Sequence, residues 1–125
     1  MVATIAVIKE TRGGETRVAA TPETVKKLMA LGYAVTIEAG AGLSASIADA
    51  DYTAAGASIA PTAAKALAVG DIVLKVRGPS DKEIAGLKAG AKIVALMNAY
   101  NDKPMLDALA AKGATGFAME FVPRI

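Results

Sequence analysis

The sequence of 125 residues contains no cysteine, no histidine and no tryptophan. The absence of cysteine excludes disulfides, thiolate nucleophiles and cysteine-ligated zinc or iron–sulfur sites. The absence of histidine excludes Ser-His-Asp triads, histidine-ligated zinc and the usual acid/base group near neutral pH. Ionisable side-chain chemistry is left to 12 carboxylates, 14 lysines and arginines and three tyrosines, and we expect no metal site.

An excess of one charge and long hydrophobic runs are missing as well. The formal net charge is +2, and the basic residues are spread along the chain, so no nucleic-acid surface is indicated. The longest uncharged stretch, residues 52–64, is broken by Gly56 and Pro61, which argues against a membrane span. The apolar opening, Val2–Ile8, is short for a signal peptide. We therefore expect a cytoplasmic protein.

Apolar residues make up 54% of the chain but aromatic residues only 4%, a composition that favours small side chains packed between helices and a sheet. The length suits one domain. Short apolar runs alternate with helical segments. Strands are predicted over residues 4–8, 34–39, 57–60, 71–76, 92–97 and 115–121, and helices over 21–32, 49–55, 62–68, 81–87 and 104–111. This alternation predicts an α/β domain, with an open parallel sheet flanked by helices in three layers.

The end of the chain follows the last predicted strand closely. Residues 115–121 have the composition of a largely buried strand, and only four residues come after them. Domains usually place their termini in exposed segments. We therefore expect the natural chain to continue beyond Ile125.

A glycine motif follows the second predicted strand. Gly40, Gly42 and Ala45 have the GxGxxA spacing of a dinucleotide fingerprint, which requires a helix that begins at the glycines. The residues after Gly42 are weak helix formers, and residues 59–65 contain no acid that could bind a ribose hydroxyl. We interpret the motif as a turn.

Charged residues lie where a parallel sheet binds its ligands. The loop of residues 9–17 follows the first strand, and the carboxyl ends of parallel strands border the ligand crevice. Lys75 stands between apolar residues within a strand, so it must pair with an acid, extend to solvent or face a cleft. Arg17 suits either a bound carboxylate, which it can hold in bidentate fashion, or contacts that hold its own loop in place.

Four segments carry a family resemblance: Ile5–Glu10 (IAVIKE), Glu15–Pro22 (ETRVAATP), Asp71–Val76 (DIVLKV) and Ala118–Ile125 (AMEFVPRI). In this order they resemble the N-terminal domain shared by alanine dehydrogenase and the alpha subunit of the proton-translocating NAD(P) transhydrogenase. The resemblance covers essentially the whole chain. It implies that Arg17 and Lys75 match the alanine dehydrogenase residues that hold the carboxylate and carbonyl of alanine or pyruvate.

Two features separate the two families. Val122–Ile125 (VPRI) resembles the transhydrogenase segment that leads into the NAD(H)-contacting loop, and the other feature is the residue at position 98. Alanine dehydrogenases use a histidine after the fifth strand as acid/base, and Asn98 falls at the matching place. Because an amide cannot accept a proton near neutral pH, the resemblance favours the transhydrogenase alpha subunit. It implies hydride transfer between NADH and NADP, coupled to proton translocation. It also implies that NAD(H) lies between this domain and an NAD-binding Rossmann domain that is absent from this chain, with Arg124 as a cofactor contact.

The resemblance also implies partners and a location. These are a membrane-embedded beta subunit, an NADP(H)-binding component, a second copy of the subunit in a homodimer, and a cytoplasmic position peripheral to the inner membrane. The isolated 125 residues are expected to be inactive and to bind NAD(H) weakly. Two alternatives stay open: a fragment of an alanine dehydrogenase-like amino-acid dehydrogenase, and a free-standing module that binds a small ligand or a partner through residues 9–17.

Overall fold

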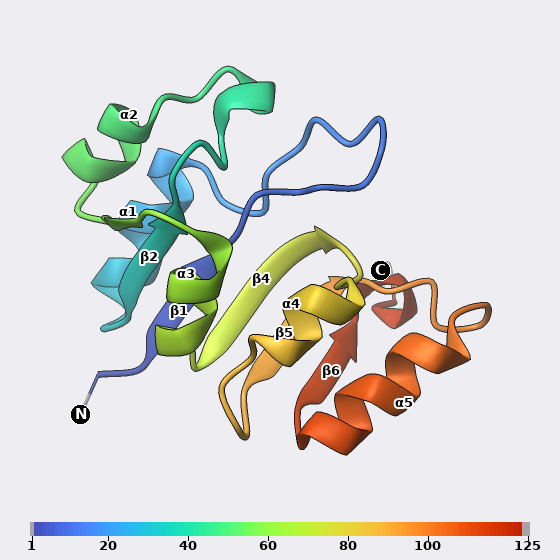
Figure 1. The fold of residues 1–125 in the computed structure, drawn as a ribbon. Helices are drawn as coiled ribbons and strands as arrows, with labels where there is room; N and C mark the ends of the chain where they lie inside the picture. Colours follow the sequence, from blue (N-terminus) through green and yellow to red (C-terminus); the bar gives the residue numbers. More distant parts are fainter. Residues whose placement is uncertain (1, 124–125) are drawn as a thin grey trace.

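The computed structural model describes residues 2–123, and in it six parallel strands form a single sheet with helices on both faces (Figure 1). The strands are β1 (Thr4–Val7), β2 (Ala34–Glu38), β3 (Ser58–Ala60), β4 (Ile72–Arg77), β5 (Lys92–Leu96) and β6 (Thr115–Ala118). The α-helices are α1 (Pro22–Ala30), α2 (Asp49–Ala54), α3 (Ala63–Val69), α4 (Asp81–Ala85) and α5 (Lys103–Lys112), and the 3₁₀ turns are η1 (Leu43–Ala45) and η2 (Met119–Phe121). The predicted α/β fold is confirmed.

The strand order is β3-β2-β1-β4-β5-β6, and every neighbouring pair is parallel. The chain builds outward from β1 to β3, then crosses back and continues from β4 to β6 on the other side. Open α/β sheets bind ligands where the order reverses, outside the carboxyl ends of the strands. Here that point lies between β1 and β4.

Local sequence explains where several helices begin. The hydroxyl of Thr21 accepts the Thr24 N–H ahead of α1, and Pro22 occupies the first helical position. A capping box of Ser80 and Glu83 starts α4. The longest described helix, α5, has 10 residues, and none in the described part of the chain is long and apolar enough to cross a bilayer.

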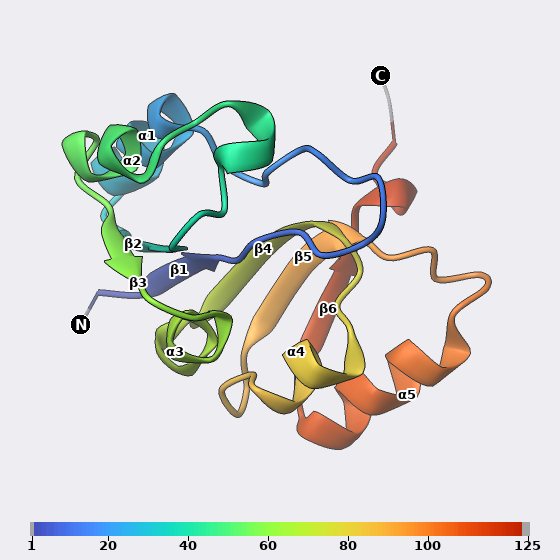
Figure 2. The same ribbon diagram turned by 45° about the horizontal axis from the view of Figure 1, so that its top comes forward.

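The helices divide the core into two layers (Figure 2). On one face, α1 and α2 cover β1, β2 and β3 around Val7, Val35 and Ile37. Tyr52 of α2 is fully buried there, and its hydroxyl donates to the carbonyl of Ala20 at 2.7 Å. On the opposite face, α3, α4 and α5 lie side by side beneath the sheet and bury the second core cluster.

On one face of the sheet, α1 and α2 cover only the half formed by β1, β2 and β3. Among the described residues, no α-helix packs on this face of β4, β5 and β6 (Figure 2). Register places Leu74, Val94, Leu96 and Phe117 on this side of the sheet, where Leu74 packs against the edge of the α1–α2 core. Leu96 and Phe117 are 39% and 48% exposed, although parallel sheets are ordinarily buried on both faces.

The prediction of a largely buried last strand over residues 115–121 is wrong. The strand ends at Ala118, residues 119–121 form η2, and Thr115, Gly116 and Phe117 are all exposed. β6 pairs only with β5, so it forms the edge of the sheet and packs on one face against α5. Its apolar composition therefore does not reflect burial within the described residues.

The glycine motif is a turn, as predicted. Gly40 has a φ of +79°, and the residues after Gly42 form the short η1 instead of an α-helix. A Cβ on Gly42 would come within 2.8 Å of the Tyr52 ring and of Ile47. Gly42 is thus required by its close packing against Ile47 and Tyr52 of α2.

Candidate functional site

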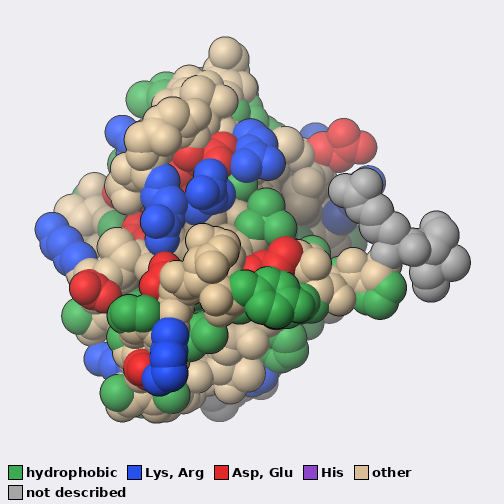
Figure 3. All heavy atoms as spheres, turned by 90° about the vertical axis from the view of Figure 1, so that its right-hand side faces the viewer, with side chains coloured by type: hydrophobic (Ala, Val, Ile, Leu, Met, Phe, Trp, Pro, Cys, Tyr) green, Lys and Arg blue, Asp and Glu red, His purple; other side chains and the backbone are tan. Residues whose placement is uncertain are grey.

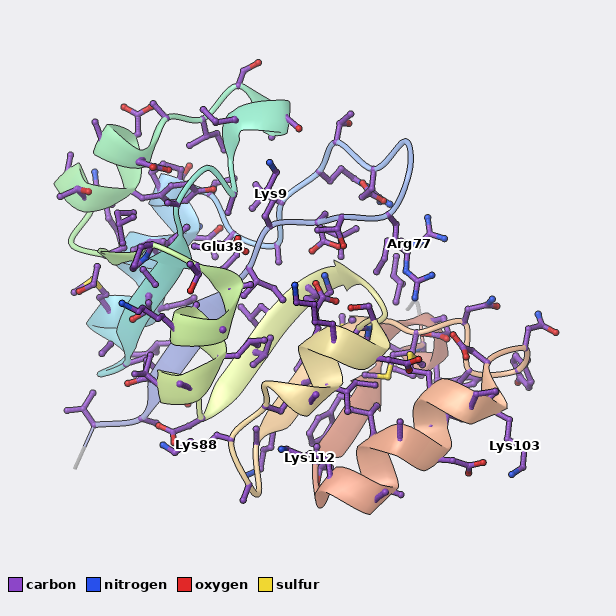
Figure 4. The ribbon with its side chains drawn as sticks, in the orientation of Figure 1. Lys9, Glu38, Arg77, Lys88, Lys103 and Lys112 are labelled. Carbon is purple, nitrogen blue, oxygen red and sulfur yellow. The ribbon has the colours of Figure 1, made fainter. Side chains whose placement is uncertain are left out.

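The carboxyl edge of the sheet gathers most of the candidate residues. Lys9, Glu38 and Arg77 lie along this edge, whereas Lys88 lies at the opposite end of the strands (Figure 4). The loop that follows β1 crosses the point between β1 and β4 at which the strand order reverses. Arg12 holds the loop there, because its guanidinium donates to the Gly78 carbonyl from Nε at 3.2 Å and from Nη2 at 3.1 Å. The loop therefore occupies the place where a Rossmann domain has its short phosphate-binding turn.

Lys75 lies in a buried cluster of charges beneath this loop. Its Nζ is 3.3 Å from Glu10 Oε1 and 3.5 Å from Glu83 Oε2. The side chains of Lys75 and Glu10 are each 2% exposed, and that of Glu83 is 10% exposed. Of the three alternatives that the sequence left open, the structure shows pairing with acids.

Local structure places each member of this cluster. β4 directs Lys75 to the face covered by α3, α4 and α5, and the capping box fixes Glu83 in the first turn of α4. Glu10 follows β1, and its carboxylate also accepts the backbone N–H groups of Val76 at 2.9 Å and Arg77 at 3.1 Å. These two residues lie where the pairing of β4 with β5 shifts register. Lys75 is thus neutralised within the fold.

Arg17 is tied to its own loop. Its Nε and Nη2 each donate to the Glu15 carboxylate at 2.8 Å, and its backbone N–H donates to the same group at 3.0 Å. Arg77 Nη1 lies 3.8 Å from that carboxylate. The side-chain hydrogen bond from Arg17, more than any other contact, lowers the pKa of Glu15 from 4.5 to about 2. Glu15 in turn raises the pKa of Arg17.

Asn98 follows β5 in a left-handed conformation, with a φ of +53°. Its Oδ1 accepts a hydrogen bond from Asn101 Nδ2 at 3.3 Å. The Glu120 carboxylate accepts the N–H groups on either side of it, from Met97 and from Ala99, each at 2.9 Å. These backbone hydrogen bonds, the one from Ala99 first, lower the pKa of Glu120. Arg124 lies outside the described residues.

A shallow hollow of about 600 Å³ lies beside Asn98. Its lining combines a cation, a carboxamide, a carboxylate and aromatic rings, contributed by Arg77, Leu96, Asn98, Tyr100, Glu120 and Phe121. Tyr100 and Phe121 meet edge to face, with ring centroids 5.1 Å apart, and Tyr100 is 85% exposed. An exposed aromatic ring beside an amide can contact a flat polar ligand.

A second hollow of about 630 Å³ lies between α3 and α4. Several of its polar groups are already engaged: Thr62 and Ser80 cap the two helices, Glu38 accepts the Lys9 N–H, and Glu83 contacts Lys75, whereas Thr11 and Lys82 also line the hollow.

The carboxyl edge does not fit a pyrophosphate. Dinucleotide sites present free backbone N–H groups at a helix N-terminus, but here three glutamates accept such groups at strand ends. Glu38 accepts that of Lys9 after β1, Glu10 accepts those at the end of β4, and Glu120 accepts those after β5. Figure 3 shows acidic and basic side chains interspersed over the side of the molecule that it presents. The arrangement suits one wall of a site and not a complete nucleotide cradle.

The sequence did not predict that Glu10, Glu38 and Glu120 accept backbone N–H groups at strand ends. Each stands at or just after the end of a strand: Glu38 closes β2, Glu10 comes three residues after β1, and Glu120 comes two residues after β6. A glutamate at the carboxyl end of an apolar strand is the signal that could have found them. Their partners depend on which strands are neighbours.

Comparison with known proteins places the chain in a family. Residues 6–125 match the family model described as "Alanine dehydrogenase/PNT, N-terminal domain". The chain belongs to this family. The resemblance stated from the sequence is confirmed.

Within the family the chain is similar to both kinds of oxidoreductase. It is 48% identical to an NAD(P) transhydrogenase subunit alpha polypeptide of Rhodospirillum rubrum, over 97% of the chain and 33% of that protein. Identity to alanine dehydrogenase of Mycolicibacterium smegmatis is 36%, over 94% of the chain and 32% of that protein. The crystal structure of transhydrogenase from Sinorhizobium meliloti superimposes with a TM-score of 0.93 at 45% identity, over 98% of the chain and 36% of that structure. The chain thus spans about a third of the length of these relatives.

Proposed function

We propose that the chain is the N-terminal domain of the NAD(H)-binding alpha subunit of a proton-translocating NAD(P) transhydrogenase. The observation that carries the proposal is the higher identity to transhydrogenases, 48% and 45%, than to the Mycolicibacterium alanine dehydrogenase, 36%. The absence of histidine supports it. Direct hydride transfer needs no side-chain proton shuttle, whereas oxidative deamination needs an acid/base group.

In this proposal the domain forms one wall of a cleft and a second, Rossmann domain binds the dinucleotide. The nicotinamide nucleotide supplies the hydride when it is bound. Arg77, Asn98 and Tyr100 line the hollow at the carboxyl edge, where they orient a flat polar group and exclude water. Arg124 contacts the cofactor in this proposal. Arg17 and Lys75 have structural roles, because each is paired with an acid of the same domain.

The proposal extends to the assembly. The subunit forms a homodimer, transfers hydride to NADP held by an NADP(H)-binding component, and is coupled to proton translocation through a membrane-embedded beta subunit. It lies in the cytoplasm, peripheral to the inner membrane. The similarity to a transhydrogenase subunit supports these partners.

NADH binding tests whether the second domain is required to bind the dinucleotide. NADH quenching and calorimetry are compared for the 125-residue chain and the full-length subunit that carries it. We expect saturation only for the full-length subunit, and we expect Arg124→Ala in it to weaken NADH binding roughly tenfold, the loss of a charged hydrogen bond. Lys27→Ala, on the exposed side of α1, is the matched control and should bind as the wild type does. Tight binding by the 125 residues alone would show that the second domain is not required.

Substrate specificity tests the choice between the two families. The full-length subunit, combined with its NADP(H)-binding component, is expected to reduce an NADP analogue with NADH. With alanine and NAD it is expected to show no turnover. Robust alanine-dependent reduction of NAD would overturn the transhydrogenase proposal in favour of an amino-acid dehydrogenase.

A further inference from the structure

Side-chain carboxylates extend the hydrogen bonding of the sheet beyond its carboxyl edge. In parallel strands, a backbone carbonyl of one strand accepts an N–H of its neighbour. Past the end of β1, Glu10 takes over this role toward β4, where it accepts two N–H groups at 2.9 and 3.1 Å. Glu10 is also buried and paired with Lys75, so its role is part of the core.

Glu120 makes the same kind of bridge from β6 to β5, but in an exposed position. Its Oε1 accepts the Met97 N–H and its Oε2 accepts the Ala99 N–H, each at 2.9 Å. The two bonds bracket Asn98 and stabilise its left-handed backbone, with φ at +53°. This conformation is less costly for asparagine than for most residues, but it still needs support from its surroundings.

The same residue begins the segment that leads out of the sheet. Glu120 lies within η2, four residues before Arg124 in the sequence. One carboxylate therefore connects the turn that carries Asn98 with η2. Both the turn and η2 line the hollow of about 600 Å³, through Asn98, Tyr100 and Phe121.

We propose that Glu120 is a positioning residue, which holds the Asn98 turn against η2 and so sets the shape of the cleft wall for hydride transfer. The inference rests on the proposed function. Glu120 itself lines the hollow, and in this proposal it acts by fixing the positions of Asn98 and η2.

The surroundings of Glu120 separate this role from a purely structural one. β5 and β6 are already joined through backbone pairing from Lys92 to Ala95, which does not depend on the carboxylate. Glu120 is exposed and contributes no buried surface to the core. Its removal should therefore loosen the cleft wall and leave the stability of the domain almost unchanged.

Glu120→Gln in the full-length subunit tests the proposal. Glutamine keeps the shape but has one acceptor oxygen, so one of the two N–H groups loses its partner and faces an amide NH₂. We expect kcat for hydride transfer to fall roughly tenfold, since small displacements of positioning groups carry large rate costs. The KM for NADH should change less than kcat, and the thermal midpoint should stay close to that of the wild type.

Hydrogen exchange of the same full-length protein shows whether the turn has moved. We expect faster exchange in the peptide that covers residues 96–101 of Glu120→Gln, and no change in the peptides of the core strands β1 and β2. Glu23→Gln, which removes a carboxylate exposed on α1, is the matched control and should match the wild type in both measurements. Glu120→Asp keeps a carboxylate and should recover part of the lost rate.

The outcomes separate this inference from the proposed function. Wild-type kcat in Glu120→Gln, with faster exchange at residues 96–101, would overturn the positioning role and leave transhydrogenase activity intact. Unchanged exchange at these residues would show that Glu120 does not hold the turn. A wild-type subunit that transfers no hydride would overturn the proposed function itself, and the positioning role with it.

Discussion

The two halves of the sheet are built from similar strands but are covered differently. β1, β2 and β3 lie between α1 and α2 on one face and α3 on the other, and Val7 and Ile37 are fully buried. β4, β5 and β6 have α4 and α5 on one face only, and Leu96 on their other face is 39% exposed. The comparison shows that strand composition alone does not determine burial.

The two halves of the sheet meet between β1 and β4, and this join carries several charged side chains. β1 and β4 are neighbours, so Glu10, in the loop that follows β1, meets Lys75 of β4. Arg12 and Glu15 of this loop reach Gly78 and Arg77 on the β4 side. A Rossmann domain binds a phosphate at the equivalent join, whereas this domain places its own acids and bases there. The following predictions test the join first and then each half.

The largest effect is expected at the join. Lys75→Met leaves Glu10 and Glu83 buried without their shared cation, and it should lower the free energy of unfolding by about 3–5 kcal/mol, measured by urea denaturation. Lys88→Met is the control, because its pair with Asp71 lies at the opposite edge with both side chains more than a third exposed. A loss for Lys75→Met no larger than that of the control would show that the buried cluster contributes little.

A matched pair of aliphatic truncations compares the two halves directly. Ile37→Ala, in the half covered on both faces, should lower the free energy of unfolding by about 3 kcal/mol, because it removes fully buried methylenes and leaves a cavity. Leu96→Ala, on the uncovered face, should lower it by less than about 1 kcal/mol. Equal losses in urea denaturation would mean that the uncovered face is buried in solution, for example in an oligomer.

The smallest effect concerns the Glu15 carboxylate, which contacts the solvent-exposed Arg17 and Arg77 at the join. The pKa of Glu15 falls from 4.5 to about 2 on folding, so its ionised form stabilises the native state above about pH 5, and this stabilisation is lost as the pH falls toward 2. The difference in thermal midpoint between the wild type and Glu15→Gln should therefore be constant near neutral pH and shrink between pH 5 and 2. Glu23→Gln serves as control, with little change of midpoint at any pH. A difference that does not depend on pH would contradict the role of the Glu15 carboxylate.

The sequence predicted the elements well because their signals are local. Strand residues in short runs, the Thr21 and Ser80 caps and the glycines after helices act within a few positions, and all five helices appear close to where they were expected. The prediction for the last strand was wrong for a different reason. Residues 115–121 have the composition of a buried strand, but β6 is an edge strand, and the strand order that puts it there is not encoded in its own residues.

For the charged residues at the carboxyl edge, the sequence indicated where they lie in the fold but not which residues they pair with. The carboxyl edge, Arg17, Lys75 and Asn98 followed from the βα pattern and the family resemblance. The pairing of Lys75 with Glu10 joins residues 65 positions apart, and that of Glu120 with Met97 joins residues 23 apart. No periodicity or spacing within either segment indicates such pairs.

The sequence by itself determined the α/β alternation, the turn at Gly40–Gly42, the chemistry excluded by the lack of cysteine and histidine, and the family. Only the tertiary structure decided which charges neutralise one another and which half of the sheet is covered on both faces. The physical reason is that propensity, capping and composition act between near neighbours in the chain, whereas ion pairs and burial depend on strand order. That order brings β1 beside β4, so Glu10 meets Lys75, and it leaves β6 at the edge.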